Sequence, residues 1–440
     1  MDISKSVMIL TVFLVSLLAP QKVNSEEASA SKKIRSNPFI NAEHIIDDQA
    51  QRVLGPKISG RYVPELAGFD QAISGVMLAW NIQGGSVALA KDGKIIYARG
   101  FGISDSSGKE VLPDSLFRVA SVSKIITGMA ILRLCNESKL KLSDKVVPLL
   151  KELINESKIS DDRWKDITVE NLLYHNSGIP QNDAWAKRIK SVSTDKNTPS
   201  EAVKYLTGQR LDFTPGSQNI YNNQNYLFLG RIIECVTGIK YSDYVKKELL
   251  VPMGILNMEI GRSKKNQKYP KEVEYGLGQN LPKLESVSSM SDEMVDAPYS
   301  YSLESMDSFG GWIASAADLV RFVTFFDGFS GPKDFIDETF WQKMVYKPEF
   351  PYIKDQTDPW QGIGWQVRKN GSGFNYWHCG SIWGTKSEVV RTADGYVWSW
   401  IFNGEVDQNV VDQLMWLAKS KMPKVPDINL TPELFPNSNL

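Results

Sequence analysis

Ser121 and Lys124 are the two residues of this sequence whose types and spacing most directly suggest covalent chemistry. They lie three positions apart at the start of the apolar stretch 117–132, so on a helix their side chains share one face. A serine hydroxyl needs an adjacent base to act as a nucleophile, and a lysine serves as that base only when its amine is neutral. Burial favours the neutral amine, as does the positive end of the helix dipole. By itself the spacing is common by chance and more often marks a helix cap followed by a solvated lysine.

Tyr221 and Asn223 form a second polar pair. They follow the turn at Pro215-Gly216 and precede a helix that we expect to begin near Asn225. Residues two apart in an extended segment point the same way, so this pair would offer a phenol and an amide to one pocket.

His378 and Gly380 lie in a β-prone stretch at 375–384. If His378 faces a pocket, the period-two alternation of a strand turns Cys379 away from it. Gly380 has no side chain and would let a ligand approach the backbone closely. The other histidines are His44 and His175, and no metal-binding spacing links the three, so we expect neither a metal nor a cofactor. We interpret His175 as a residue that stabilises the turn after a helix.

Taken in order, the three motifs resemble the signature of the serine penicillin-recognising enzymes. This group contains class C β-lactamases, DD-peptidases, D-aminopeptidases and related esterases, and a close variant of its Ser-x-x-Lys motif is well described. The resemblance covers about Gly60 to Lys419, nearly the whole mature chain. The motifs and the further stretches that match in register are Ser121-x-x-Lys124, Tyr221-x-Asn223, His378-x-Gly380, 92–94, 172–178, 213–216, 226–233 and 309–318.

The resemblance implies a role for each residue of the motifs. Ser121 would be the acylated nucleophile and Lys124 its proton acceptor, while Tyr221 would carry a proton to the leaving group. Asn223 would hydrogen-bond the amide of the substrate. The backbone N–H groups of Ser121 and Ser381 would form the oxyanion hole.

His378 stands where class C β-lactamases carry a lysine. This departure favours the DD-peptidase, D-aminopeptidase and esterase branches, with weak or absent β-lactamase activity. We therefore expect a secreted serine hydrolase that forms an acyl-enzyme from an amide or ester. The alternative is a catalytically silent or weakly active binding or regulatory protein that keeps the fold, although every nucleophile and base position is filled.

The elements that must position these residues follow from the periodicity of the chain. A helix is predicted over 69–80, a hairpin over 86–100 with its turn at Asp92-Gly93, strands over 362–402 and a closing helix over 409–419. The stretch 117–340 is mostly helical in pattern, and Ser315 and Asp318 form a capping box. We expect the polar region 262–301 to form surface loops.

These patterns predict an α/β fold of the α+β type. One antiparallel sheet, built from strands at both chain ends and flanked by helices, would leave fewer open edges than two separate sheets. The predicted hydrolase domain spans 61–420, with a large and mainly helical inserted subdomain at about 130–355.

The N-terminus is typical of a cleavable export signal. Lys5 precedes an apolar run of about 13 residues, shorter than the roughly 20 needed to span a bilayer. The small residues nearby suit cleavage after Ser25. We therefore expect a signal peptide at 1–25, a linker or arm at 26–60, a C-terminal tail at 421–440, and a secreted or periplasmic protein with no membrane span in the mature chain.

Composition excludes several classes of function. The 440 residues carry 50 basic and 51 acidic side chains, a balance that argues against nucleic-acid binding through bulk charge. With 3 cysteines the chain has no disulfide framework. We expect a small-molecule or short-peptide substrate, and the sequence leaves the oligomeric state open.

Overall fold

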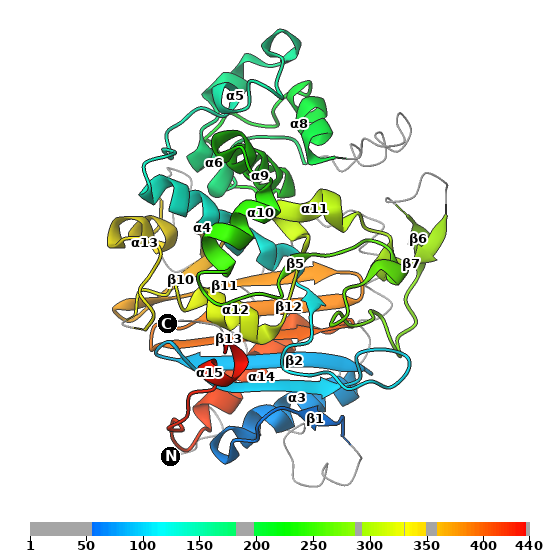
Figure 1. Cartoon of the computed structure of the whole chain (residues 1–440). Coiled ribbons are helices and arrows are strands. Elements are labelled where there is room, and N and C mark those ends of the chain that lie inside the picture. The colour runs from blue at the N-terminus through cyan, green and yellow to red at the C-terminus, as the bar shows by residue number, and fades with distance from the viewer. Residues whose placement is uncertain (1–54, 182–197, 287–292, 330, 349–358, 437–440) are drawn as a thin grey trace, which may run out of the picture. The chain divides into compact units, whose positions relative to one another are not determined.

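Strands from opposite ends of the sequence pair with each other at the centre of the main sheet (Figure 1). The computed structural model describes residues 55–181, 198–286, 293–329, 331–348 and 359–436, all within the unit Gln51–Leu440. In it, β2 (Gly84–Lys91) runs antiparallel to β13 (Tyr396–Phe402), with Val87 opposite Trp400. The predicted α/β fold with one antiparallel sheet built from both chain ends is confirmed.

Within the described residues the main sheet has eight strands, in the order β1-β3-β2-β13-β12-β11-β10-β9. All neighbouring pairs are antiparallel. The strands not yet given bounds are β1 Ile58–Ser59, β3 Lys94–Gly102, β9 Trp360–Gln361, β10 Gln366–Asn370, β11 Gly373–Ile382 and β12 Thr385–Arg391.

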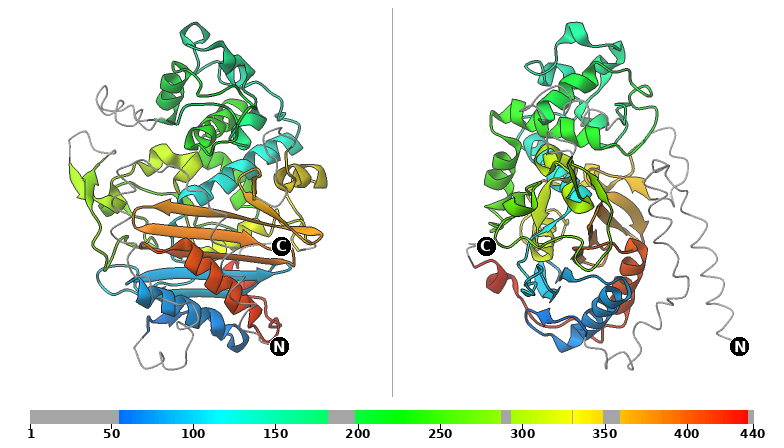
Figure 2. Two further views of the ribbon diagram at one scale, coloured as in Figure 1. Left: turned by 180° about the vertical axis from the view of Figure 1, so that it is seen from behind. Right: turned by 90° about the vertical axis from the view of Figure 1, so that its right-hand side faces the viewer.

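Helices cover both faces of the central strands. The helices α3 (Ala67–Ala79) and α14 (Gln408–Ser420) pack together on the face seen from behind in Figure 2, and α12 (Ala316–Val323) packs against β2 and β13 on the other face. Every residue of β13 is therefore buried, and Trp398 and Trp400 are fully enclosed. Burial on both faces explains why these strands are continuous apolar runs rather than alternating ones.

Most of the helices lie between β3 and β9 in the chain, and they form the upper part of Figure 1 together with the part in front of the sheet. Apart from α12, these helices are α4 Ser123–Asn136, α5 Val146–Leu149, α6 Val169–Leu173, α8 Pro199–Thr207, α9 Asn223–Thr237, α10 Tyr241–Val245, α11 Leu303–Gly310 and α13 Glu338–Val345. The short C-terminal helix is α15 Thr431–Leu434.

The same part of the chain also contains short strands that the sequence pattern did not indicate. A small sheet has the order β4-β8-β5, formed by Phe117–Arg118, Trp312–Ala314 and Glu259–Ile260. In the region expected to form loops, β6 (Lys283–Glu285) pairs with β7 (Met294–Asp296). Strands of two or three residues are too short for a period-two pattern to stand out.

Several local predictions are confirmed. The hairpin turns at Asp92 and Gly93, both with positive φ. The Ser315 side chain accepts from the N–H of Asp318 at 3.0 Å, and the Asp318 carboxylate accepts from the N–H of Ser315 at 2.9 Å, which is a capping box. None of the helices within the described ranges is long and apolar enough to cross a bilayer. The predicted signal peptide, 1–25, lies outside these residues.

Candidate active site

Ser121 lies at a sharp change of direction between a strand and a helix. The strand β4 pairs with β8, and the N–H of Val119 extends this pairing to the carbonyl of Trp312 at 3.0 Å. Ala120 then has φ 46°, a left-handed conformation rare for a residue with a side chain. The chain continues into a 3₁₀ turn, η4 (Ala120–Val122), with Ser121 at its middle, and then into α4.

Lys124 lies in the first turn of α4 and is completely buried. Its Nζ is 3.2 Å from Ser121 Oγ and donates a hydrogen bond of 2.8 Å to the carbonyl of Phe309. That carbonyl belongs to the last turn of α11, where helix carbonyls lack an intrahelical partner. Burial lowers the pKa of Lys124 well below its usual value. A neutral amine that donates to Phe309 still has a lone pair to accept the Ser121 proton.

The Tyr221 ring lies beside this pair. Lys124 Nζ is 4.9 Å from the centre of the Tyr221 ring, and the rings of Tyr221 and His378 are 6.2 Å apart. Burial raises the pKa of the Tyr221 hydroxyl, an effect opposed by a hydrogen bond between the Tyr221 and Ser121 side chains. The phenol is therefore protonated at neutral pH and able to give a proton to a group bound next to Ser121.

Asn223 is in a helix, which corrects the expectation of an extended segment. The helix α9 begins at Asn223 rather than near Asn225, because the side chain of Asn222 caps it by accepting from the N–H of Gln224 at 2.9 Å. The Oδ1 atom of Asn223 is buried and has no hydrogen-bond partner within the described ranges. A buried amide oxygen without a partner is available to a bound molecule.

His378 is on the buried face of β11. Its Nδ1 is 2.8 Å from the carbonyl of Cys379, so Nδ1 carries the ring proton and Nε2 is a hydrogen-bond acceptor. Burial, assisted by the nearby Lys124, lowers the pKa of His378 to about 3. The ring is thus neutral where a related enzyme would carry a lysine cation. As expected from the strand alternation, Cys379 lies on the other face, where its Sγ contacts Glu388 Oε1 at 3.3 Å.

Gly380 has a structural role in addition to the ligand approach that we predicted for it. A Cβ at Gly380 would overlap the carbonyl oxygen of Val119 and the hydroxyl of Ser387. The Ser387 hydroxyl donates to that same carbonyl at 2.9 Å. The missing side chain therefore admits the backbone just before Ser121, and the third motif fixes the position of the first.

Ser381, the predicted second oxyanion donor, is on the part of β11 that packs against η4. It faces Lys386 of β12, whereas Ile382 faces Thr385 across the two-residue turn at Trp383-Gly384. A two-residue hairpin turn is closed by a hydrogen-bonded pair, and bonded and non-bonded pairs alternate along an antiparallel ladder. The Ser381 N–H therefore points away from β12. At that edge β10 pairs only as far as Trp377, which leaves this N–H free of the sheet.

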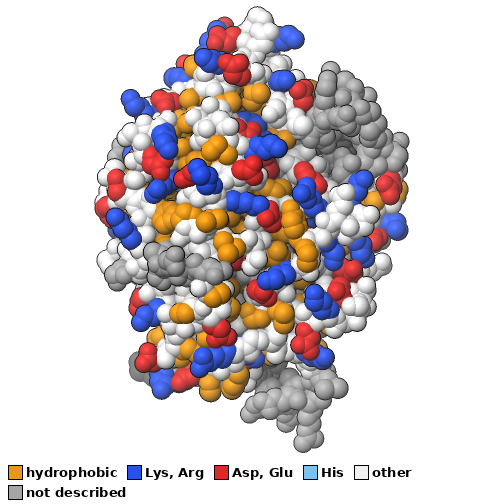
Figure 3. All heavy atoms as spheres, in the orientation of Figure 1, with side chains coloured by type: hydrophobic (Ala, Val, Ile, Leu, Met, Phe, Trp, Pro, Cys, Tyr) orange, Lys and Arg blue, Asp and Glu red, His pale blue; other side chains and the backbone are white. Residues whose placement is uncertain are grey.

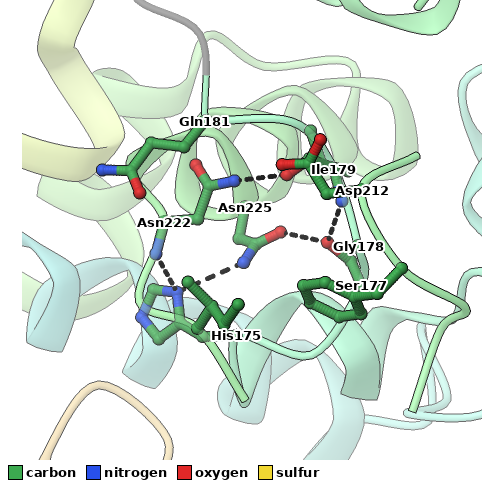
Figure 4. Close-up of a pocket in the computed structure, with 10 residues that line it drawn as sticks. His175, Ser177, Gly178, Ile179, Gln181, Asp212, Asn222 and Asn225 are labelled. Carbon is green, nitrogen blue, oxygen red and sulfur yellow. Dashed lines mark hydrogen bonds between the residues drawn. The ribbon is translucent and has the colours of Figure 1, made fainter. Parts of the chain in front are cut away.

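A small cavity lies beside the Tyr221 segment (Figure 4). It measures about 60 Å³, and both apolar and polar side chains form its walls. The residues that line it are His175, Ser177, Gly178, Ile179, Gln181, Asp212, Phe213, Ile220, Asn222 and Asn225.

The structure thus brings Ser121, Lys124, Tyr221 and His378 together, and Gly380 supports the Ser121 segment. The carbonyl of Phe309 could not be predicted from the sequence, because any residue type supplies a backbone acceptor. His175 was expected only to stabilise a turn, although its side chain contacts Tyr221.

A family model described as beta-lactamase matches residues 69–419, a span that contains all the residues of this site. Protein flp of Staphylococcus aureus (strain MRSA252) is 30% identical over 237 residues, which are 53% of this chain and 45% of flp. The chain spans about half the length of the curated relatives it matches.

Solved structures share the fold. The octameric penicillin-binding protein homologue from Pyrococcus abyssi matches with a TM-score of 0.62 at 21% identity, over 83% of this chain and 80% of that one. The D-amino acid amidase from Ochrobactrum anthropi SV3 matches with a TM-score of 0.59 at 22% identity, over 78% of this chain and 94% of that one.

Proposed function

This chain belongs to the beta-lactamase family and is a serine hydrolase, and from that premise we propose that it cleaves amides or esters that lack a carboxylate, through an acyl-enzyme on Ser121. The observation that carries the proposal is the 3.2 Å separation between Ser121 Oγ and the completely buried Lys124 amine. A nucleophile within hydrogen-bond reach of a base is the arrangement that covalent catalysis requires.

The first half of the reaction forms the acyl-enzyme. Ser121 Oγ attacks the carbonyl carbon while its proton passes to Lys124 Nζ. The backbone N–H groups of Ser121 and Ser381 hold the oxyanion, and loss of one such donor costs about 100- to 1000-fold in rate. The bond to the leaving amine or alcohol breaks as the Tyr221 hydroxyl donates a proton to that group. The proton held by Lys124 then passes to Tyr221 and restores its hydroxyl. In the second half, water attacks the carbonyl carbon of the acyl ester and loses a proton to Lys124 and Tyr221. These two residues pass a proton to Ser121 Oγ as the acid is released.

His378 favours a particular class of substrate. A neutral imidazole with Nε2 as an acceptor suits a substrate that presents a hydrogen-bond donor, such as an amine or amide N–H. A cation would suit a carboxylate instead. We therefore place D-amino-acid amides and short acyl esters ahead of D-Ala-D-Ala peptides and β-lactams, both of which carry a carboxylate. The names of the Ochrobactrum D-amino acid amidase and of the Streptomyces D-stereospecific amidohydrolase point to the same chemistry in proteins of this fold.

A rate panel tests this order. The purified protein is given a D-amino-acid amide, a p-nitrophenyl ester, a D-Ala-D-Ala peptide and nitrocefin, and kcat/KM is measured for each. The proposal predicts that the amide or the ester exceeds the two carboxylate substrates by at least about tenfold. Faster cleavage of the peptide or of nitrocefin contradicts the substrate class. No turnover of any of the four favours the silent binding protein.

We further propose that the protein is exported and that residues 1–25 are removed. Determination of the N-terminal residue of the exported protein tests this proposal. The expected new N-terminus is Glu26. Retention of Met1 contradicts it.

A further inference from the structure

The segment that carries Tyr221 is built on the turn that follows α6. The N–H of Ile220 donates to the carbonyl of His175 at 2.9 Å, and the N–H of Asn222 donates to the His175 ring at Nδ1 at 3.1 Å. These two residues flank Tyr221 on either side. The backbone N–H groups on both sides of Tyr221 therefore donate to the same residue, His175.

The His175 side chain also contacts the Tyr221 ring itself. The two ring centres are 4.6 Å apart, and the Nδ2 of Asn225 lies 3.2 Å from His175 Nδ1 (Figure 4). Because Nδ1 accepts from a backbone N–H, the ring proton is on Nε2 and the imidazole is neutral. Burial, with Lys124 and His378 nearby, lowers the pKa of His175 well below its usual value, which keeps this acceptor in place.

The backbone of His175 is held in an unfavourable conformation. It has φ 56° and is 1% exposed. A residue other than glycine rarely adopts this region, and such residues persist where the surroundings over-determine them, often at active sites. The conformation lets the carbonyl and the ring of one residue reach both neighbours of Tyr221.

We propose that His175 is a positioning residue for the hydrolase reaction, acting through Tyr221: its carbonyl, Nδ1 and ring face hold the phenol beside Ser121. This inference rests on the proposed function. The Nδ1 atom of His175 accepts from Asn222 and Asn225, so this atom is not available to take a proton from the substrate.

Three substitutions separate the parts of this role. His175→Asn keeps an acceptor near the position of Nδ1, and asparagine tolerates positive φ. His175→Gln places its amide at the position of Nε2, and His175→Ala removes the side chain. With p-nitrophenyl butyrate, kcat is expected to fall about 100-fold for Ala and Gln, the effect of a misplaced catalytic group, with KM within about threefold. Asn is expected to remain within about tenfold of wild type, since it loses only the ring contact.

The route through Tyr221 is tested by a double-mutant cycle. If His175 acts by positioning the phenol, His175→Ala lowers kcat less than about threefold in a Tyr221→Phe background. Retention of the full 100-fold effect in that background overturns the proposal, as does an Asn variant as slow as the Ala variant.

A matched control accounts for the backbone strain. Ser138→Ala also places alanine at a positive φ, 57°, but in the exposed turn that follows α4. It is expected to change thermal stability without changing kcat. Labelling of Ser121 by a fluorophosphonate distinguishes failure of the proposed function from failure of the proposed role of His175. If wild-type protein does not react, the proposed function and this inference both fall. If wild type reacts and turns over ester while His175→Ala has an unchanged kcat, the inference alone falls.

Discussion

Lys124 has to be uncharged before it can take a proton from Ser121, and its burial favours the uncharged form. The unfolded chain binds a proton at this lysine up to a pKa of about 10.4, and burial lowers this pKa in the folded protein. Between the two pKa values the unfolded state holds more protons. The free energy of unfolding therefore rises with pH as far as the lysine is concerned.

Lys124→Met separates catalysis from stability. The apolar side chain is expected to raise the free energy of unfolding by about 0.5–2 kcal/mol at pH 7, as removal of strained active-site groups commonly does. This advantage over wild type shrinks as the pH approaches 10. The value of kcat is expected to fall about 100- to 10000-fold with the loss of the base. Urea unfolding at pH 7 and pH 9.5 measures the first effect, and ester hydrolysis the second. A variant that is less stable at pH 7 contradicts the burial argument.

Gly380→Ala tests whether the third motif supports the first. The added methyl group would overlap the carbonyl of Val119 and the hydroxyl of Ser387, so the Ser121 segment has to shift. We expect a loss of about 1–3 kcal/mol in stability and a fall of at least about tenfold in kcat. Thermal unfolding and ester hydrolysis measure the two. The control is Gly68→Ala in α3, where a methyl group meets nothing within 4 Å and kcat should not change. Wild-type kcat in the Gly380 variant would show that the contact is not needed.

At the residue scale, the sequence was sufficient to name the groups that meet. The spacing of Ser121 and Lys124 constrains their geometry because a single helical turn joins them. The reason for Gly380 could not be predicted, because its neighbour Val119 is distant in sequence and contributes a backbone atom. The link between His175 and Tyr221 was missed for a similar reason.

At the scale of elements, long periodic segments were predictable and short ones were not. The helix α14, the capping box of α12 and the hairpin β2–β3 each have several residues in pattern. The start of α9 was missed by two residues because Asn222 caps it, and two adjacent asparagines, Asn222 and Asn223, look alike in sequence. The strands β4 to β8 have two or three residues each and carry no pattern.

The packing of α14 on the sheet encloses the carboxyl group of Glu388. Glu388 of β12 accepts from Trp400 Nε1 at 2.8 Å, and Asp412 of α14 lies nearby. Burial, with Asp412 adding to it, raises the pKa of Glu388 to about 8. The folded protein therefore holds a proton that the unfolded chain loses near pH 4.5. The resulting stability is complete at low pH and is lost as the pH rises toward 8.

Glu388→Gln removes this dependence because glutamine stays neutral and can still accept from Trp400. The variant is expected to be more stable than wild type at pH 8, by about 1–3 kcal/mol, and to match it closely at pH 5. Thermal unfolding at the two pH values is the measurement. Glu338→Gln on the exposed face of α13 is the control and should leave both values unchanged. An equal effect of Glu388→Gln at pH 5 and pH 8 would show that the carboxyl does not titrate in this range.

At the scale of the whole molecule, the site depends on the helical middle of the chain packing against the C-terminal strands. Ser121 and Tyr221 come from the helical middle, whereas His378 and Gly380 come from the C-terminal strands. The β-prone runs at both ends of the chain predicted that their strands would join in one sheet, since two separate sheets would leave more exposed edges. The helices expected at 69–80 and 409–419 flank the sheet as α3 and α14, as predicted. The covering of the other face by α12 was not predicted, because an apolar strand does not say which helix covers it.

The central claim is that Ser121 is the nucleophile and that the folded site activates it. The most direct measurement is peptide mass mapping after reaction with a fluorophosphonate, applied to wild type, Ser121→Ala and Lys124→Met. The account predicts one adduct per chain on Ser121, none in the Ser121 variant, and adduct formation at least about 100-fold slower in the Lys124 variant. An adduct on another residue, or equal labelling of all three proteins, would contradict it.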